Sequence, residues 1–213
     1  MTENPMGSYD GSILWPNTGS VYFFSGSQYY KFDIAANTVP GGYPMSTAAS
    51  WPGLDGAFIH GAAVWPTGGK AYFFDRDNYY SYDIAANKVD DAYPRPTALN
   101  WPGVLGAFQD HRVDAVVPWT NGSVYFFQDD RYYRVDPTTK KVDPGYPMPI
   151  KDNWPGLWTT GNNIRGGFVW PQLVEGHQVA YFFHSAFYMR YDIENNKVDD
   201  GYPKPITGNW KGL

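Results

Sequence analysis

Short runs of aromatic and β-branched residues alternate with turn residues along the whole chain. Residues 21–24 and 29–32 are two such runs, and the Ser-Gly-Ser-Gln between them predicts a β-hairpin. Residues 13–16 predict a further strand before this hairpin. Residues 39–45 predict an outer strand, because the proline that follows Gly-Gly-Tyr limits pairing on one side. No segment has a sustained helical period, so we expect an all-β protein with about four strands per unit.

The same unit recurs four times. The sequence Tyr-Phe-Phe is followed 29 residues later by a tryptophan in every copy, at Trp51, Trp101, Trp154 and Trp210. The distance from each tryptophan to the next Tyr-Phe-Phe grows from 21 to 24 to 27 residues. Insertions are therefore expected only in the connections between units.

Four units of four short strands predict radial closure into a β-propeller, because no unit can bury its own faces alone. We expect one domain over residues 1–213, with blades at about 9–54, 55–104, 105–157 and 158–213. The first strand of each blade should lie next to the axis, where small side chains are needed. The small residues at these places are Gly11, Gly61, Ala115 and the pair Gly166-Gly167.

Composition narrows the classes of function. Hydrophobic residues make up 43% of the 213 residues, so the 18 prolines and 23 glycines indicate turns, not disorder. A net charge of −5 argues against nucleic acid as a partner. No apolar stretch is long enough for a membrane span and no signal peptide is evident, which predicts a cytoplasmic or intracellular protein, with secretion of a mature form left open. The chain has no cysteine, so disulfides and thiolate sites are excluded. A monomer and a homodimer both remain open.

The units resemble the hemopexin repeat, with an Asp-Ala-Ala-like first strand followed by Tyr-Phe-Phe, Tyr-Tyr-x-Tyr-Asp, Gly-Tyr-Pro and Trp-Pro-Gly-Leu. The resemblance spans residues 9–213, and in organisation the chain is similar to single-domain members such as seed albumins of the pea-albumin-2 type or small microbial hemopexin-like proteins. It implies a central channel in which backbone carbonyls at the start of each first strand bind Ca²⁺ or Na⁺. The matching positions are Asp10, His60, Asp114 and Arg165. Because His60 and Arg165 replace acidic residues, Ca²⁺ should bind more weakly than to a ring of four aspartates.

Heme and a polyamine are two further candidate ligands. His60 and His111 could reach one face of the disc near the axis, although two ordinary loop histidines are the alternative. His177 and His184 flank one predicted strand and should lie about 20 Å apart, too far to ligate one iron. A polyamine could sit between Asp10 and Asp114, but the neighbouring arginine argues against it.

Carbohydrate binding is the main alternative, because sugar faces stack on exposed aromatic rings. Most aromatic residues here are expected in the core, whereas Trp119 and Trp158 stand outside or shifted from the repeat and are expected to be exposed. No Gly-x-Ser-x-Gly, phosphate-loop or His-Glu-x-x-His motif occurs, so we expect no enzyme. The sequence thus predicts a ligand-binding protein, with a lectin or defence protein that binds between blades, or a protein-interaction scaffold, as alternatives.

Overall fold

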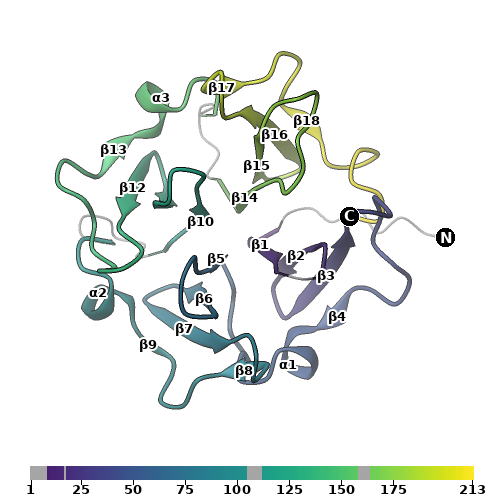
Figure 1. The fold of residues 1–213 in the computed structure, drawn as a ribbon. Helices are drawn as coiled ribbons and strands as arrows, with labels where there is room; N and C mark the ends of the chain where they lie inside the picture. The colour runs from purple at the N-terminus through teal and green to yellow at the C-terminus, as the bar shows by residue number, and fades with distance from the viewer. Residues whose placement is uncertain (1–8, 17, 105–111, 158–163) are drawn as a thin grey trace.

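The computed structural model describes residues 9–16, 18–104, 112–157 and 164–213. Within these ranges the chain forms four antiparallel sheets, arranged as four blades around a central axis (Figure 1). The predicted all-β, four-bladed β-propeller is thereby confirmed.

Each blade begins with an inner strand near the axis and continues outward through two longer strands to one or two short outer strands (Figure 1). Blade 1 contains β1 (Gly11–Trp15), β2 (Ser20–Ser25), β3 (Gln28–Asp33) and β4 (Met45–Ser46). Blade 2 contains β5 (Gly61–Val64), β6 (Lys70–Asp75), β7 (Asn78–Asp83), β8 (Lys88–Val89) and β9 (Arg95–Pro96). Blade 3 contains β10 (Ala115–Pro118), β11 (Val124–Gln128), β12 (Arg131–Val135) and β13 (Met148–Pro149). Blade 4 contains β14 (Gly167–Val169), β15 (Val179–His184), β16 (Phe187–Asp192), β17 (Lys197–Val198) and β18 (Lys204–Pro205).

The outer strand is shorter than predicted. Of residues 39–45, only Met45 belongs to a strand, and it pairs with Tyr29 of β3. Gly42 has a φ of 97°, so the chain turns before this strand begins. The hairpin predicted from residues 21–24 and 29–32 is present as β2 and β3, with Val21 opposite Phe32.

One-turn helices precede three of the repeated tryptophans. They are α1 (Thr47–Ser50), α2 (Thr97–Asn100) and α3 (Ile150–Asn153). The tryptophan follows each helix directly and lies at the seam between two blades. The ring of Trp51, for example, lies 5.5 Å from Phe24 of blade 1 and 5.5 Å from Phe73 of blade 2. The constant 29-residue spacing therefore reflects one packing contact repeated around the ring.

The ring closes between blade 4 and blade 1 without a disulfide. The Trp210 ring lies 5.0 Å from Phe183 of blade 4 and 4.8 Å from Phe32 of blade 1. The amide of Val39 donates a hydrogen bond of 2.9 Å to the carbonyl of Lys211. Apolar packing and a backbone hydrogen bond therefore join the last segment of the chain to the first blade.

Candidate functional site: the central channel

The four inner strands enclose the axis and all run in the same direction along it. Residues 10, 60, 114 and 165 occupy equivalent places just before these strands. At each position the backbone amide donates a hydrogen bond of 2.7 to 3.0 Å to the carbonyl oxygen of the last phenylalanine of Tyr-Phe-Phe in the same blade. The four predicted positions are thus structurally equivalent at one end of the channel, which we call the polar end.

Side chains at the polar end interact between blades. Arg165 Nη1 lies 3.8 Å from Asp10 Oδ1, which joins blades 4 and 1. Burial and the positive charge of Arg112 lower the pKa of His60 to about 4, with a smaller lowering contribution from Arg165. The imidazole of His60 is therefore neutral at pH 7, and guanidinium groups from two other blades influence it.

Both carboxylates at the polar end already have hydrogen-bond donors. Asp10 Oδ2 accepts from the amide of Gly26 at 2.7 Å. Asp114 accepts from the amide of Asp129 at 2.8 Å and from Arg112 Nε at 2.7 Å. Burial raises the pKa of Asp114, and the charge of Arg112 opposes this rise. These side chains serve mainly to hold the turns between the second and third strands against the axis.

This donor set fits Ca²⁺ poorly. Ca²⁺ prefers six to eight oxygen ligands with several carboxylates, whereas both carboxylates here bond to N–H groups and two arginines lie beside them. Backbone carbonyls remain as donors, but that of His60 packs against blade 1, where a Cβ added to Gly11 would lie only 2.1 Å from its oxygen. The central cation therefore stays a prediction that rests on the resemblance.

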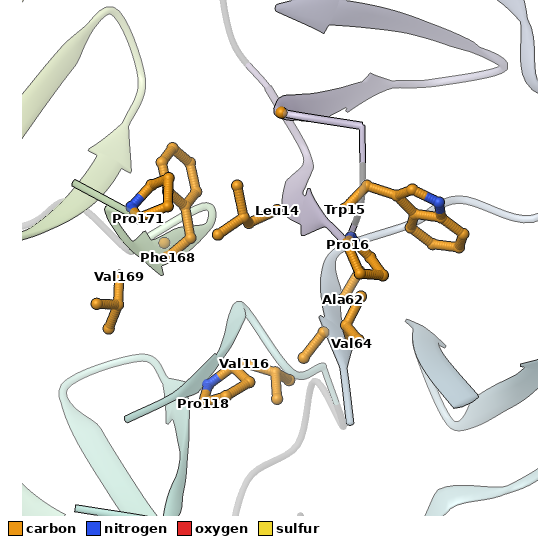
Figure 2. A pocket seen from close by; sticks show the side chains of 13 residues that line it. Leu14, Trp15, Pro16, Ala62, Val64, Val116, Pro118, Phe168, Val169 and Pro171 are labelled. Atoms are coloured by element: carbon orange, nitrogen blue, oxygen red, sulfur yellow. The ribbon is translucent and has the colours of Figure 1, made fainter. Parts of the chain in front are cut away.

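The opposite end of the channel is apolar and holds a cavity of about 380 Å³ (Figure 2). All four inner strands contribute to its wall, and none of the described residues that line it carries a charge. The principal side chains are those of Leu14, Trp15, Pro16, Val64, Val116, Pro118, Phe168, Val169 and Pro171. The channel thus has a polar end at the start of the inner strands and an apolar end where they finish.

Sequence reasoning missed the apolar end, although a signal was present. Three inner strands run into Trp-Pro and the fourth into Pro-Trp, at residues 15–16, 65–66, 170–171 and 118–119. Pro16, Pro118 and Pro171 line the cavity and make its rim apolar. Repetition of this pair in all four blades was the available indication.

Trp119, predicted to be exposed and to stand outside or shifted from the repeat, is shifted by one place because Pro118 precedes it. Trp119 is partly buried, and its ring lies 5.0 Å from that of Trp154 in an edge-to-face contact. Trp15 makes the same contact with Trp51, also at 5.0 Å. The order Pro-Trp instead of Trp-Pro concealed this equivalence. His111 and Trp158, the other candidate ligand-binding residues, lie outside the described residues.

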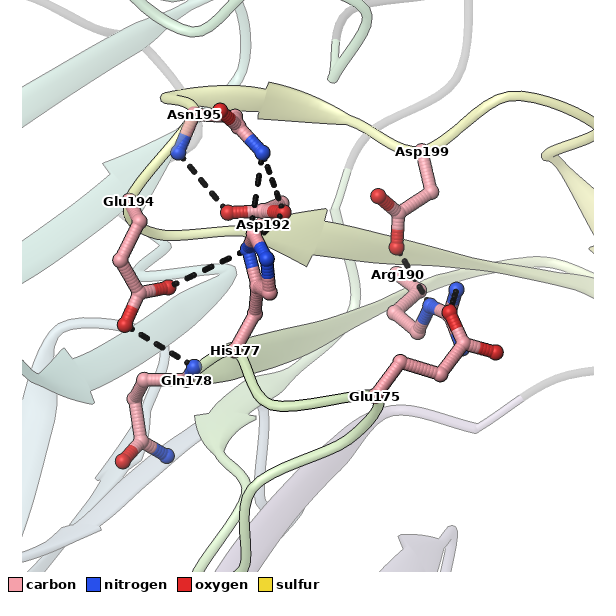
Figure 3. Close-up of polar contacts among 8 residues, drawn as sticks. All are labelled: Glu175, His177, Gln178, Arg190, Asp192, Glu194, Asn195 and Asp199. Atoms are coloured by element: carbon pink, nitrogen blue, oxygen red, sulfur yellow. Dashed lines mark hydrogen bonds and ion pairs between the residues drawn. The ribbon is translucent and has the colours of Figure 1, made fainter.

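A second polar cluster lies on blade 4, away from the axis (Figure 3). His177 Nδ1 lies 2.7 Å from Asp192 Oδ2 and 3.9 Å from Glu194 Oε2. His184, by contrast, is buried, and neither of its ring nitrogens has a hydrogen-bond partner. The cluster was not predicted, because His177 and His184 were weighed only as heme ligands.

Among the described residues, no helix has the length and apolar character needed to cross a membrane. The fold and the channel together define a class of protein, the single four-bladed propeller with an axial channel. The chain belongs to the hemopexin family, whose repeat matches it four times, at residues 10–56, 59–104, 113–159 and 174–213.

Several solved structures share this fold over almost the whole chain. The seed albumin LS24 from Lathyrus sativus superimposes with a TM-score of 0.80 at 19% identity, covering 96% of this chain and 95% of its own. The hemopexin fold protein CP4 from cow pea has a TM-score of 0.78 at 20% identity, covering 95% of each chain. A plant lectin with two metal binding sites from Cicer arietinum has a TM-score of 0.79 at 20% identity, covering 96% of each chain.

Matches to curated sequences are shorter. Interstitial collagenase B of Mus musculus is 30% identical over 86 residues, which is 40% of this chain and 17% of the collagenase. Human vitronectin is 41% identical over 61 residues, 26% of this chain and 13% of vitronectin. The matched segments thus make up less than a fifth of these longer relatives.

Proposed function

We propose that this protein is a non-enzymatic binding protein that takes a small apolar organic molecule into the apolar end of its central channel. The supporting observation is the cavity of about 380 Å³ on the axis, to which all four inner strands contribute. Its volume falls within the range of about 300–1,000 Å³ that small-molecule sites occupy. An apolar ligand would gain about 25 cal/mol for each Å² of apolar surface removed from water.

The chemistry of the lining favours an apolar ligand over heme or a polyamine. No histidine or tyrosine lines the cavity among the described residues, so an iron bound there would lack these axial ligands. A polyamine would need carboxylates, and the nearest ones, Asp10 and Asp114, are hydrogen-bonded at the opposite end beside arginine. A central cation held by backbone carbonyls at the polar end is compatible with a ligand at the apolar end.

Titration with 8-anilinonaphthalene-1-sulfonate tests the proposal, because its fluorescence rises on transfer to an apolar site. We expect one site per chain. Val169→Glu should weaken binding at least tenfold by placing a charge in the wall of the cavity. Leu173→Glu is the matched control, because Leu173 is 63% exposed and does not line the cavity. Equal loss in both variants, or binding at many sites, would contradict an axial ligand site.

Carbohydrate binding between blades is the second candidate. A small cavity of about 100 Å³ lies at the seam of blades 4 and 1, with Trp170 and Trp210 beside the amides of Asn37 and Asn209. Tryptophan faces and side-chain amides together suit a sugar, and a lectin is among the proteins of similar fold. A calorimetric titration with a sugar panel checks this: binding that Asn209→Ala abolishes would favour the seam. Absence of heat with both sugar and apolar probe would favour a protein-interaction scaffold.

A further inference from the structure

Blade 4 carries a cluster of one histidine and two carboxylates that has no counterpart among the described residues of the other blades. The carboxylate of Asp192 closes the turn after β16, accepting from the amide and the side chain of Asn195 at 2.8 Å each. Asp33 and Asp83 close the same turn in blades 1 and 2. Two positions after this aspartate, however, blade 4 has Glu194 where blades 1 and 2 have alanine.

The third member comes from an extra hairpin between β14 and β15. Val174 and His177 exchange two backbone hydrogen bonds of 2.9 and 3.0 Å around a tight turn. This turn brings the His177 ring over the end of β16, so that Nδ1 faces the two carboxylates (Figure 3). Glu194 in turn accepts a hydrogen bond of 3.0 Å from the amide of Gln178. The backbone therefore holds all three side chains before any ligand binds.

The geometry of these three residues matches that of a metal site. One nitrogen of His177 and one oxygen each of Asp192 and Glu194 lie within 4.8 Å of one another. An ion with bond lengths of about 2.0–2.2 Å spans at most about 4.4 Å between two ligands, so small side-chain rotations would let it contact all three. Glu194 and His177 are more than a third exposed, so a fourth position stays open to water. Imidazole with two carboxylates is a donor set for zinc, whereas Ca²⁺ prefers oxygen alone.

The charge around the cluster favours a cation. Arg190 is the nearest positive group, and it is already paired with Asp199 and with Glu175, whose Oε2 lies 3.1 Å from Nη2. Lys197, opposite Asp192 in β17, lies 3.7 Å from Asp200. Apart from His177 itself, no basic side chain is paired with Asp192 or Glu194 among the described residues.

We propose that His177, Asp192 and Glu194 form a Zn²⁺ site on the outer part of blade 4, independent of the central channel. On binding, the ion takes the place of the hydrogen between Nδ1 and Asp192, and the neutral imidazole carries its single proton on Nε2. The hairpin that carries His177 is then fastened to the β16 turn by the metal. The site is separate from the proposed function, which concerns an apolar ligand on the axis.

Isothermal titration of the full chain with Zn²⁺, and separately with Ca²⁺, tests the site. We expect one Zn²⁺ per chain, and no binding of Ca²⁺ at this cluster. Glu194→Ala should weaken Zn²⁺ binding at least tenfold, since losing even an outer-shell partner costs about 10- to 100-fold. This variant places on blade 4 the residue found in blades 1 and 2, so the fold should tolerate it.

Glu175→Gln is the matched control, because it removes one negative charge from the same hairpin without removing a proposed ligand. It should leave Zn²⁺ affinity within about twofold. Histidine NMR adds a direct reading, in which the signals of His177 shift with Zn²⁺ and those of His60 do not. No Zn²⁺ binding, or equal losses in Glu194→Ala and Glu175→Gln, would overturn the proposal. If the apolar probe did not bind while Zn²⁺ still did, only the axial ligand site would be contradicted.

Discussion

Gly11→Ala tests whether the inner strands meet at the axis as closely as described. A Cβ at this position would lie 2.1 Å from the carbonyl oxygen of His60 and 2.9 Å from that of Ile59. Both contacts are with backbone of the next blade, not with a movable side chain end. Relief therefore requires β1 to move away from the start of β5, which opens the ring between blades 1 and 2.

The expected cost follows from overpacking. Extra methylenes in a tight core typically cost about 1–3 kcal/mol, and contact with backbone places Gly11→Ala at the upper end, about 3 kcal/mol. For a chain of this length each kcal/mol lowers the melting temperature by about 2–4 °C. We therefore expect the melting temperature to fall by about 6–12 °C.

Differential scanning calorimetry of the wild type, Gly11→Ala and Gly41→Ala provides the measurement. Gly41 is exposed, its φ is not positive, and a Cβ there would meet nothing within 4 Å. Gly41→Ala should thus leave stability unchanged or raise it by about 0.4–1 kcal/mol through the unfolded state. A Gly11→Ala protein that melts within about 1 °C of the wild type would refute the close approach of blades 1 and 2.

Two other predictions concern the stability of the protein at acidic pH and the tryptophans at the seams between blades. Because burial and Arg112 lower the pKa of His60 to about 4, the unfolded chain binds a proton there that the folded protein does not. Stability should therefore fall as the pH drops from about 6.5 to 4, by up to about 1.4 kcal/mol per unit of pKa difference, and the urea midpoint of the wild type should fall further over this range than that of His60→Gln. Trp101 is fully buried, with its ring 5.5 Å from Phe126 of the next blade, so Trp101→Ala should cost about 3–5 kcal/mol. A urea denaturation showing a loss below 2 kcal/mol would contradict its role in joining blades 2 and 3.

The sequence was sufficient to predict the architecture, because each repeat must pack against a neighbouring repeat on both faces. A unit whose two faces are both apolar needs a neighbour on each side, and four identical units satisfy this by closing into a ring. The tryptophans at a constant spacing, such as Trp51 and Trp101, marked the seams for the same reason. The polar positions before the inner strands, Asp10 and His60 among them, could be aligned by repeat and by family resemblance.

Several features could not be read from the chain alone. Local order concealed the equivalence of Trp119 with Trp15, because Pro-Trp replaces Trp-Pro. The identity of Asp10 and Asp114 did not reveal that turn amides and Arg112 already bond to their carboxylates. The turn amides lie 15 and 16 residues away from these aspartates, so only the folded chain brings them together.

By itself, then, the sequence determined the number of blades, their seams and the positions nearest the axis, since these follow from a local pattern that recurs. Only the tertiary structure decided that the channel is polar at one end and hollow and apolar at the other. It also decided that His177 meets Asp192 and Glu194. A cavity is space that four separate strands leave unfilled, and a side-chain cluster depends on how a hairpin lies over a neighbouring turn. The cluster has no period along the chain, and the repeated Trp-Pro pair marks the apolar end without showing how much space it leaves.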